Sequence, residues 1–158
     1  MNELITLDGL CIKSVDYGET DAIINVYATG RGKISAKVRG ARGAKSKLRY
    51  AASPPTFARY VFSVKGDKAT VTACDVYDSF FSLTADPVKF YAACTAAEFL
   101  DKTQPEGEYN NSLMLACLNC LRDLAYSDKD GEEVLRAFLL DALAAIGYAR
   151  PGGRLRDL

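Results

Sequence analysis

The sequence contains no histidine among its 158 residues. Since histidine is the side chain most often used for general acid–base catalysis near neutral pH, mechanisms that need an imidazole are excluded. Carboxylate chemistry remains open, because Asp16, Glu19 and Asp21 lie in one short segment that could hold Mg²⁺ in a nuclease. The same residues, placed around Gly18, are also typical of a tight polar turn between two strands. We expect the turn and predict that the chain is not an enzyme; the carboxylate-metal nuclease stays as an alternative.

The sequence is also poor in residues that could form a disulfide framework or a zinc site. Its cysteines are odd in number: Cys11, Cys74, Cys94, Cys117 and Cys120. The last three fall among apolar positions with helical spacing, so we expect reduced, buried thiols. The last two form a C-x-x-C, but no second cysteine pair and no histidine exists to complete a tetrahedral site. The sequence therefore predicts no metal and no cofactor.

Long apolar runs are absent as well. None approaches the roughly 18 to 20 residues that cross a bilayer. The first residues, M-N-E-L-I-T-L-D-G, include acidic side chains and no basic region, which predicts that there is no signal peptide. With 49% hydrophobic and 25% charged residues, the composition is typical of a globular cytoplasmic protein of one domain or two small ones.

Basic residues, by contrast, are concentrated in one segment that carries no acidic residue. Since the formal net charge of the whole chain is zero, this concentration predicts a polarised surface. Lysine and arginine release condensed counterions when they neutralise phosphates, so the surface is a candidate for DNA binding; a solvated loop that aids solubility is the alternative. The expected binding residues are Arg31, Lys33, Lys37, Arg39, Arg42, Lys45, Lys47, Arg49 and Tyr50.

Charge and hydrophobic periodicity both change partway along the chain. Residues 1–70 hold 12 basic and 6 acidic residues, whereas residues 71–158 hold 8 basic and 14 acidic residues. Near Asp78 the apolar pattern changes from a period of 2 to a period of 3.6. We therefore expect an α+β chain with one domain over residues 1–78 and a helical domain over residues 79–158.

The first half is expected to contain five short strands. Lys33–Arg39 alternates clearly: Ile34, Ala36 and Val38 lie on one face, and the basic side chains lie on the other. Five short strands suit a small antiparallel barrel of the OB-fold type, which leaves no exposed sheet edge. The expected strands are Leu10–Val15, Ala22–Tyr27, Lys33–Arg39, Phe57–Val64 and Ala69–Val76, the last two joined as a hairpin.

The second half predicts three amphipathic helices. Asp86 and Pro87 have the spacing of an N-cap and first helical residue, which places the first helix from Pro87 to about Lys102. The second is expected from about Asn111 to Tyr126. Asp130 and Glu133 have capping-box spacing before a third helix that ends at Gly147. Three such helices with short links predict a compact bundle.

Three stretches of the first half resemble a known family. They read K-S-V-D-Y-G-E-T-D over residues 13–21, G-R-G-K-I-S-A-K-V-R-G-A-R over residues 30–42, and K-S-K-L over residues 45–48. These stretches resemble the first strand and turn, the glycine-lysine strand and the basic loop of the RecO family of bacterial DNA repair and recombination mediators. The helical half resembles the family more loosely, through its helix pattern and the I-G-Y at Ile146–Tyr148.

The resemblance implies an OB-fold and a helical domain that bind single- and double-stranded DNA and anneal complementary strands. It also implies work with RecR and single-strand binding protein to load RecA onto coated single strands, in the cytoplasm at the nucleoid. Family members are not known as enzymes. Many continue past the Gly-Tyr with a four-cysteine zinc site that is missing here, so a fragment and a shortened relative are both open.

The residues themselves predict contact with the sugar-phosphate backbone and therefore weak sequence preference. Aromatic side chains near the basic segment could stack on bases, and for Tyr50 stacking and simple exposure are equally open. For Tyr60 we expect core packing beside Phe62. A protein-interaction adaptor without direct DNA binding is a further alternative. The other aromatic candidates are Tyr17, Tyr27 and Phe57.

Overall fold

The computed structural model describes residues 2–43 and 48–147. The chain divides into two compact units that are interleaved in the sequence. One comprises Met1–Ser79 and Leu100–Tyr109, and the other comprises Phe80–Phe99 and Asn110–Leu158. Residues 100–109 lie in the half of the sequence that was expected to be the helical domain, but they belong to the unit that contains the strands.

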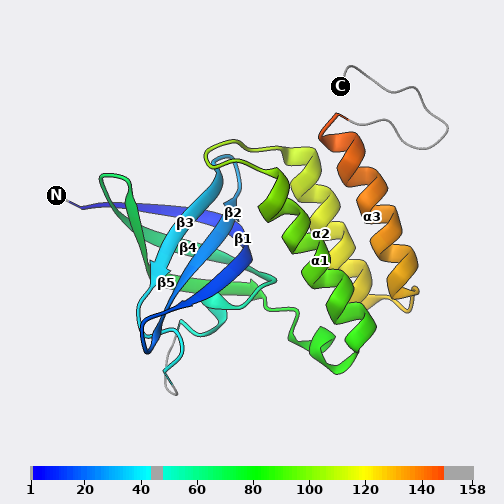
Figure 1. The fold of residues 1–158 in the computed structure, drawn as a ribbon, viewed down its shortest axis with the longest axis horizontal. Helices are drawn as coiled ribbons and strands as arrows, with labels where there is room; N and C mark the ends of the chain where they lie inside the picture. The colour runs from blue at the N-terminus through cyan, green and yellow to red at the C-terminus, as the bar shows by residue number, and fades with distance from the viewer. Residues whose placement is uncertain (1, 44–47, 148–158) are drawn as a thin grey trace. The chain divides into compact units, whose positions relative to one another are not determined.

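Five strands of the first unit close into a barrel in the order β1-β2-β3-β5-β4 (Figure 1). The strand-forming segments are those that the alternating pattern predicts. Four of them have limits within two residues of those expected, whereas the first strand begins seven residues before the expected Leu10. Together with the helices that follow, they confirm the α+β class. The strands are β1 (Glu3–Tyr17), β2 (Asp21–Ala28), β3 (Gly32–Val38), β4 (Thr56–Lys65) and β5 (Lys68–Asp78).

One neighbouring pair in the barrel is parallel, which differs from the expected antiparallel barrel. Four pairs are antiparallel, but β3 and β5 run parallel and meet at Lys37 and Thr70. Strand direction cannot alternate around a closed ring with an odd number of members. A five-stranded barrel must therefore contain at least one parallel pair, and here that pair closes the ring.

The first strand is long because it takes part in both sides of the barrel. Its residues Glu3–Cys11 pair with β4, and its residues Gly9–Tyr17 pair with β2. The register with β2 shifts between Cys11 and Lys13. Such a bulge bends a strand and increases its twist, so a single strand can follow the curvature of the wall.

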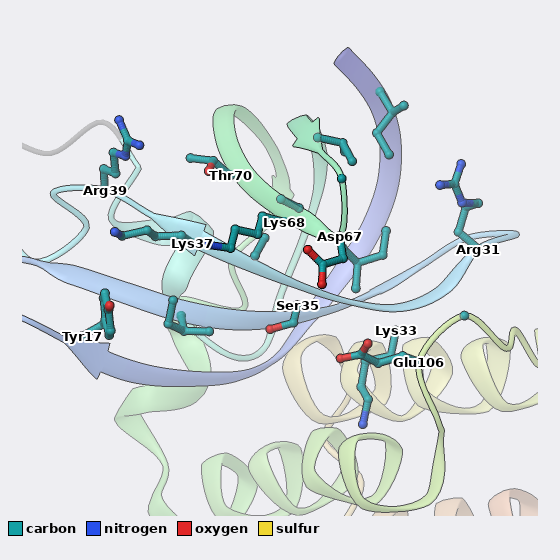
Figure 2. A pocket seen from close by; sticks show the side chains of 18 residues that line it. Tyr17, Arg31, Lys33, Ser35, Lys37, Arg39, Asp67, Lys68, Thr70 and Glu106 are labelled. Atoms are coloured by element: carbon teal, nitrogen blue, oxygen red, sulfur yellow. The ribbon is translucent and has the colours of Figure 1, made fainter. Parts of the chain in front are cut away.

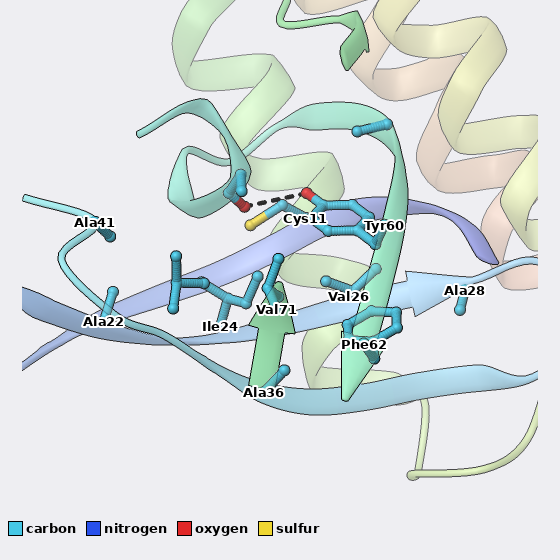
Figure 3. Close-up of a cluster of buried hydrophobic side chains, with 13 residues drawn as sticks. Cys11, Ala22, Ile24, Val26, Ala28, Ala36, Ala41, Tyr60, Phe62 and Val71 are labelled. Carbon is cyan, nitrogen blue, oxygen red and sulfur yellow. Dashed lines mark hydrogen bonds between the residues drawn. The ribbon is translucent and has the colours of Figure 1, made fainter. Parts of the chain in front are cut away.

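Side chains that point inward fill the barrel with one apolar core (Figure 3). Tyr60 and Phe62 are fully buried there and their rings stack, with centroids 5.7 Å apart. The Tyr60 hydroxyl donates a hydrogen bond of 3.1 Å to the carbonyl of Ala51, which lies in a short 3-10 turn, η1 (Tyr50–Ala52). Burial raises the pKa of Tyr60, so the phenol stays a donor. The predicted core position of Tyr60 is confirmed.

The second unit contains a 3-10 turn, η2 (Phe81–Ala85), and three helices, of which α1 contributes its last residues to the first unit. Asp86 accepts hydrogen bonds from the amides of Val88 and Lys89, and Asp130 accepts one from the amide of Glu133, as expected for caps. The third helix ends two residues before Gly147. The helices are α1 (Pro87–Thr103), α2 (Asn111–Tyr126) and α3 (Gly131–Ala145).

The helical periodicity correctly predicts the buried side of α2. Leu113, Cys117, Leu121 and Leu124 are all buried, and the thiol of Cys117 has its pKa raised by that burial. Asn110, just before the helix, accepts a hydrogen bond from the amide of Leu113. Within residues 2–43 and 48–147, no helix has the length and apolar character that crossing a membrane requires.

Candidate nucleic-acid interface

A groove of about 820 Å³ lies between β3 and the β4–β5 hairpin (Figure 2). Its apolar lining includes Ile34, Val64 and Ala69. Figure 2 shows Arg31 at one end and Arg39, Lys37 and Tyr17 at the other. The basic residues that line it are Arg31, Lys33, Lys37, Arg39 and Lys68, and the acidic ones are Asp67 and Glu106.

The alternation of β3 produces this basic face, as the sequence predicts. Ala36 and Val38 are buried in the core, whereas Ser35 and Arg39 are exposed. The strand rises by about 3.3 Å per residue, so eight steps from Arg31 to Arg39 cover about 26 Å. That length is enough for several nucleotides of an extended strand.

The start of β3 requires a glycine because another segment lies against it. Gly32 has a φ of 85°, and a Cβ placed on it would lie 2.4 Å from the carbonyl oxygen of Glu108. Next to it, the amide of Gly107 donates a 3.3 Å hydrogen bond to the carbonyl of Lys33. Residues 106–108 therefore cover the edge of β3 at this end of the groove.

Lys33 is held inside its own unit by Asp101. Its ammonium group donates a 2.9 Å hydrogen bond to the carbonyl of Asp101 and lies 3.8 Å from the carboxylate, and its side chain is only 15% exposed. The same carboxylate accepts a 2.7 Å hydrogen bond from Asn25 and lies 3.9 Å from Lys13. Lys33 is therefore paired with an acidic residue from outside the basic segment.

Lys37 is shared between an aromatic ring and a carboxylate. Its ammonium group lies 4.9 Å from the centre of the Tyr17 ring and 3.8 Å from Asp21. The hydrogen bond that the amide of Gly40 donates to Asp21, 2.8 Å long, lowers the pKa of this carboxyl, and the charges of Lys37 and Arg39 lower it further. Asp21 therefore stays ionised and partly neutralises the basic end of the groove.

Arg42 anchors the loop after β3 to the turn between β1 and β2. Its guanidinium donates to the carbonyls of Asp21 (3.2 Å) and Gly18, and lies 3.5 Å from Asp16. The amide of Arg42 also donates to the carbonyl of Thr20. Although the basic segment contains no acidic residue, three of its members have counter-charges from outside it. Asp101, Asp21 and Asp16 pair with Lys33, Lys37 and Arg42.

Three other residues of the expected DNA-binding set have no acidic ion-pair partner in the described part of the chain. Arg31, Arg39 and Arg49 are exposed and form no ion pair with any residue in the described part of the chain. Arg49 lies over the ring of Tyr50, 5.6 Å from its centre, and that ring is exposed at the start of η1. Lys45 and Lys47 lie outside the described residues.

Sequence reasoning missed Lys68 at the opposite wall of the groove. It is the first residue of β5, lies between the two strands that were expected to form the hairpin, is exposed, and lines the groove together with Thr70. Lys65, at the other end of the β4–β5 turn, is exposed as well. Lys68 could have been predicted from the expected fold. In an OB-type barrel the loop between strands 4 and 5 is one of the loops that bind ligands, and Lys68 lies at that loop.

Two of the aromatic candidates are excluded from stacking by burial. Tyr27 and Tyr60 have no exposed surface, and Phe57 is half-buried against the ring of Tyr77. Tyr17 and Tyr50 are exposed.

The carboxylates of the β1–β2 turn serve the loop contacts described above. Among the described residues, no three cysteine, aspartate or glutamate side chains gather in a way that could hold a metal ion. Asp16 and Asp21 instead face Arg42 and Lys37. This arrangement gives the nuclease alternative no structural support.

Two known protein families match this chain, one over the half that contains the strands and one over the helical half. The family described as "Recombination protein O N terminal" matches residues 1–80, and the family described as "Recombination protein O C terminal" matches residues 84–150.

Curated relatives are similar to nearly the whole chain. The DNA repair protein RecO of Acetivibrio thermocellus is 32% identical over 149 residues, which are 94% of this chain and 59% of the relative. The proteins of that name from Pelotomaculum thermopropionicum and Moorella thermoacetica are 32% and 30% identical over 92% and 94% of this chain, and 56% and 55% of the relatives. The chain thus spans a little over half the length of these relatives. With a match to each of its two parts, the chain belongs to the RecO family of DNA repair proteins.

Proposed function

We propose that the chain is a DNA-binding recombination and repair mediator that binds single- and double-stranded DNA without sequence specificity. Residues 1–78 form the OB-fold DNA-binding domain, to which residues 100–109 contribute, and residues 79–158 form the helical domain. The chain anneals complementary strands and acts without catalysing a reaction. It works at the nucleoid in the cytoplasm.

The observation that carries this proposal is the groove beside β3, with cations on both walls. Arg31 and Arg39 come from the β3 side and Lys68 from the β4–β5 hairpin. Cations on two walls of a groove suit a backbone that passes between them. Such contacts read phosphates and sugars, so the binding that they produce is tolerant of sequence.

The free cations set the expected salt dependence. Each phosphate contact on single-stranded DNA contributes about 0.7 to the slope of log K against log salt. Changing Arg31, Arg39 and Lys68 together to alanine removes three contacts and should flatten that slope by about 2. These three side chains have no ion-pair partner among the described residues, so the barrel should fold as before.

The test is a fluorescence-anisotropy titration of labelled single- and double-stranded oligonucleotides over a range of salt concentrations. A matched control changes Arg122, Lys129 and Arg136 to alanine, which removes the same charge from the helical part of the chain. We expect the control to keep the parent slope and the groove variant to lose about 2 units of it. Equal slopes for both variants would exclude the groove, and binding by none of the proteins would favour the protein-interaction adaptor.

The family resemblance extends the proposal to partners. RecR and single-strand binding protein are the expected protein partners, and RecA loading on coated single strands is the expected outcome of their joint action. The annealing part is tested by mixing complementary oligonucleotides with the parent chain and with the groove variant. The parent should accelerate annealing, and the groove variant should lose this effect at the salt concentration where it loses binding.

A further inference from the structure

Two exposed side chains, Val15 and Tyr17, and the half-buried Ile23 form a continuous strip beside the basic end of the groove. Val15 and Ile23 are directly paired across β1 and β2, and Tyr17 follows Val15 on the same face of β1. Val15 is 51% exposed and Tyr17 is 52% exposed, and Ile23 and Tyr17 both line the groove. Single exposed apolar residues are ordinary, but adjacent ones on a strand face are a candidate contact surface.

Two cations and one carboxylate lie beside this strip. The carboxylate is that of Asp21, which is paired with Tyr17 across β1 and β2 and lies 3.8 Å from Lys37. Ile23 is paired with Lys37 across β2 and β3, and the ammonium group of Lys37 lies over the Tyr17 ring. Arg39 lies at the same end of the groove, as Figure 2 shows. A ligand that covers the strip must therefore offer a flat apolar face and negative charges close to it. Nucleotides of a DNA strand meet both conditions, because each base is attached to a sugar that has a phosphate on either side.

We propose that Val15, Tyr17 and Ile23 form a stacking platform for an unpaired base of a DNA strand, while Lys37 and Arg39 hold the adjoining phosphates. This inference rests on the proposed DNA-binding function and assigns one site within it. In a duplex the faces of each base are covered by its neighbours, so the platform is available to single strands only. It adds about tenfold to single-strand affinity and nothing to duplex affinity.

The absence of tryptophan from the sequence allows a direct test. Tyr17→Trp places a single indole on the platform, and stacking on a base quenches indole fluorescence. The matched control is Tyr77→Trp. Tyr77 is 49% exposed on β5 and has a guanidinium 5.9 Å from its ring centre, but it donates a 2.8 Å hydrogen bond to the carboxylate of Asp8. Arg59, the cation over the Tyr77 ring, is itself paired with Asp8 at 3.1 Å, whereas Arg39 beside the platform forms no ion pair with a described residue.

Both proteins are titrated with oligothymidylate and with a duplex, and binding is followed independently by the anisotropy of a label on the DNA. For Tyr17→Trp we expect the single strand to quench the indole at the concentration where anisotropy rises, and the duplex to quench it less. For Tyr77→Trp we expect no quenching. Binding by anisotropy without quenching in Tyr17→Trp would refute the platform and leave the proposed function intact. Equal quenching in both variants would refute it also, since the contact would then not be local.

A second variant separates stacking from charge. Tyr17→Ala should weaken single-strand binding about tenfold and leave duplex affinity and the salt slope unchanged, because no phosphate contact is removed. A change in the salt slope equal to one phosphate contact would show that Tyr17 acts by positioning Lys37, and would overturn the stacking role. If neither the parent nor any variant binds DNA, the proposed function fails and the platform fails with it.

Discussion

Replacing Asp21 by asparagine should strengthen DNA binding. The carboxylate lies 3.8 Å from Lys37 and accepts the 2.8 Å hydrogen bond from the amide of Gly40. Asparagine keeps an oxygen that can accept that bond but loses the negative charge. Lys37 is then no longer shared with a carboxylate, so its contact with the DNA phosphate beside Tyr17 becomes complete. Completing that contact makes the slope of log K against log salt steeper by at most about 0.7, which corresponds to at most about fivefold tighter single-strand binding at 0.1 M salt relative to a 1 M reference.

Glu19 provides the matched control for this change. It is an exposed acidic residue in the same turn, and no ion pair joins it to another described residue. Glu19→Gln alters the net charge equally and should change affinity much less. Both variants are titrated by anisotropy over the same salt series. Equal strengthening by the two changes would refute the argument, because it would show that only net charge matters and that the contact with Lys37 does not.

The carboxylate of Asp21 should also make the stability of the fold depend on pH in the acid range. Since the folded-state pKa of Asp21 is below its ordinary 3.8, its contribution to folding is complete above pH 3.8 and is lost as the pH falls below that value. The urea midpoint of Asp21→Asn should therefore approach that of the parent chain as the pH falls below 3.8. A gap between the two midpoints that is the same at neutral and acid pH would contradict this assignment.

Further changes test the barrel itself. Gly32→Ala should destabilise the fold by about 1 to 3 kcal/mol, measured by urea unfolding, because the added methyl group meets Glu108 at a positive φ; an unchanged midpoint would contradict the close approach. Tyr60→Phe should cost about 1 to 3 kcal/mol, since the carbonyl of Ala51 loses its buried donor, with DNA affinity unchanged. Burial raises the pKa of Cys74 from 9.0 to about 11, so its thiol at pH 8 should react with a disulfide reagent about a hundredfold more slowly than in the unfolded chain, followed by mass spectrometry.

Local patterns in the sequence predicted much of this fold. The alternation in Lys33–Arg39 places β3 and its basic face correctly, and the helix over Asn111–Tyr126 has the expected limits. Such features depend on side chains that are neighbours along the chain. The parallel pair of β3 and β5 was not predicted. It could have been, because a closed ring with an odd number of strands requires at least one parallel pair.

Contacts between distant residues could not be predicted in the same way. Lys33 and Asp101 are 68 residues apart, and nothing in either local pattern indicates that they meet. Residues 100–109 add three acidic residues and one basic residue to the barrel unit, which then holds 13 basic and 11 acidic residues. The charge separation between the two halves of the sequence is therefore much weaker in the folded unit.

The interleaving of the two units also has a consequence for synthesis. The chain leaves the ribosome from its N-terminus, and all five strands are present once Asp78 has emerged. The contacts that Asn25, Tyr27 and Lys33 make with residues 101–107 can form only after most of α1 has been translated as well. The nascent barrel therefore matures in two stages, and its β3 edge gains its cover about thirty residues after its last strand is complete.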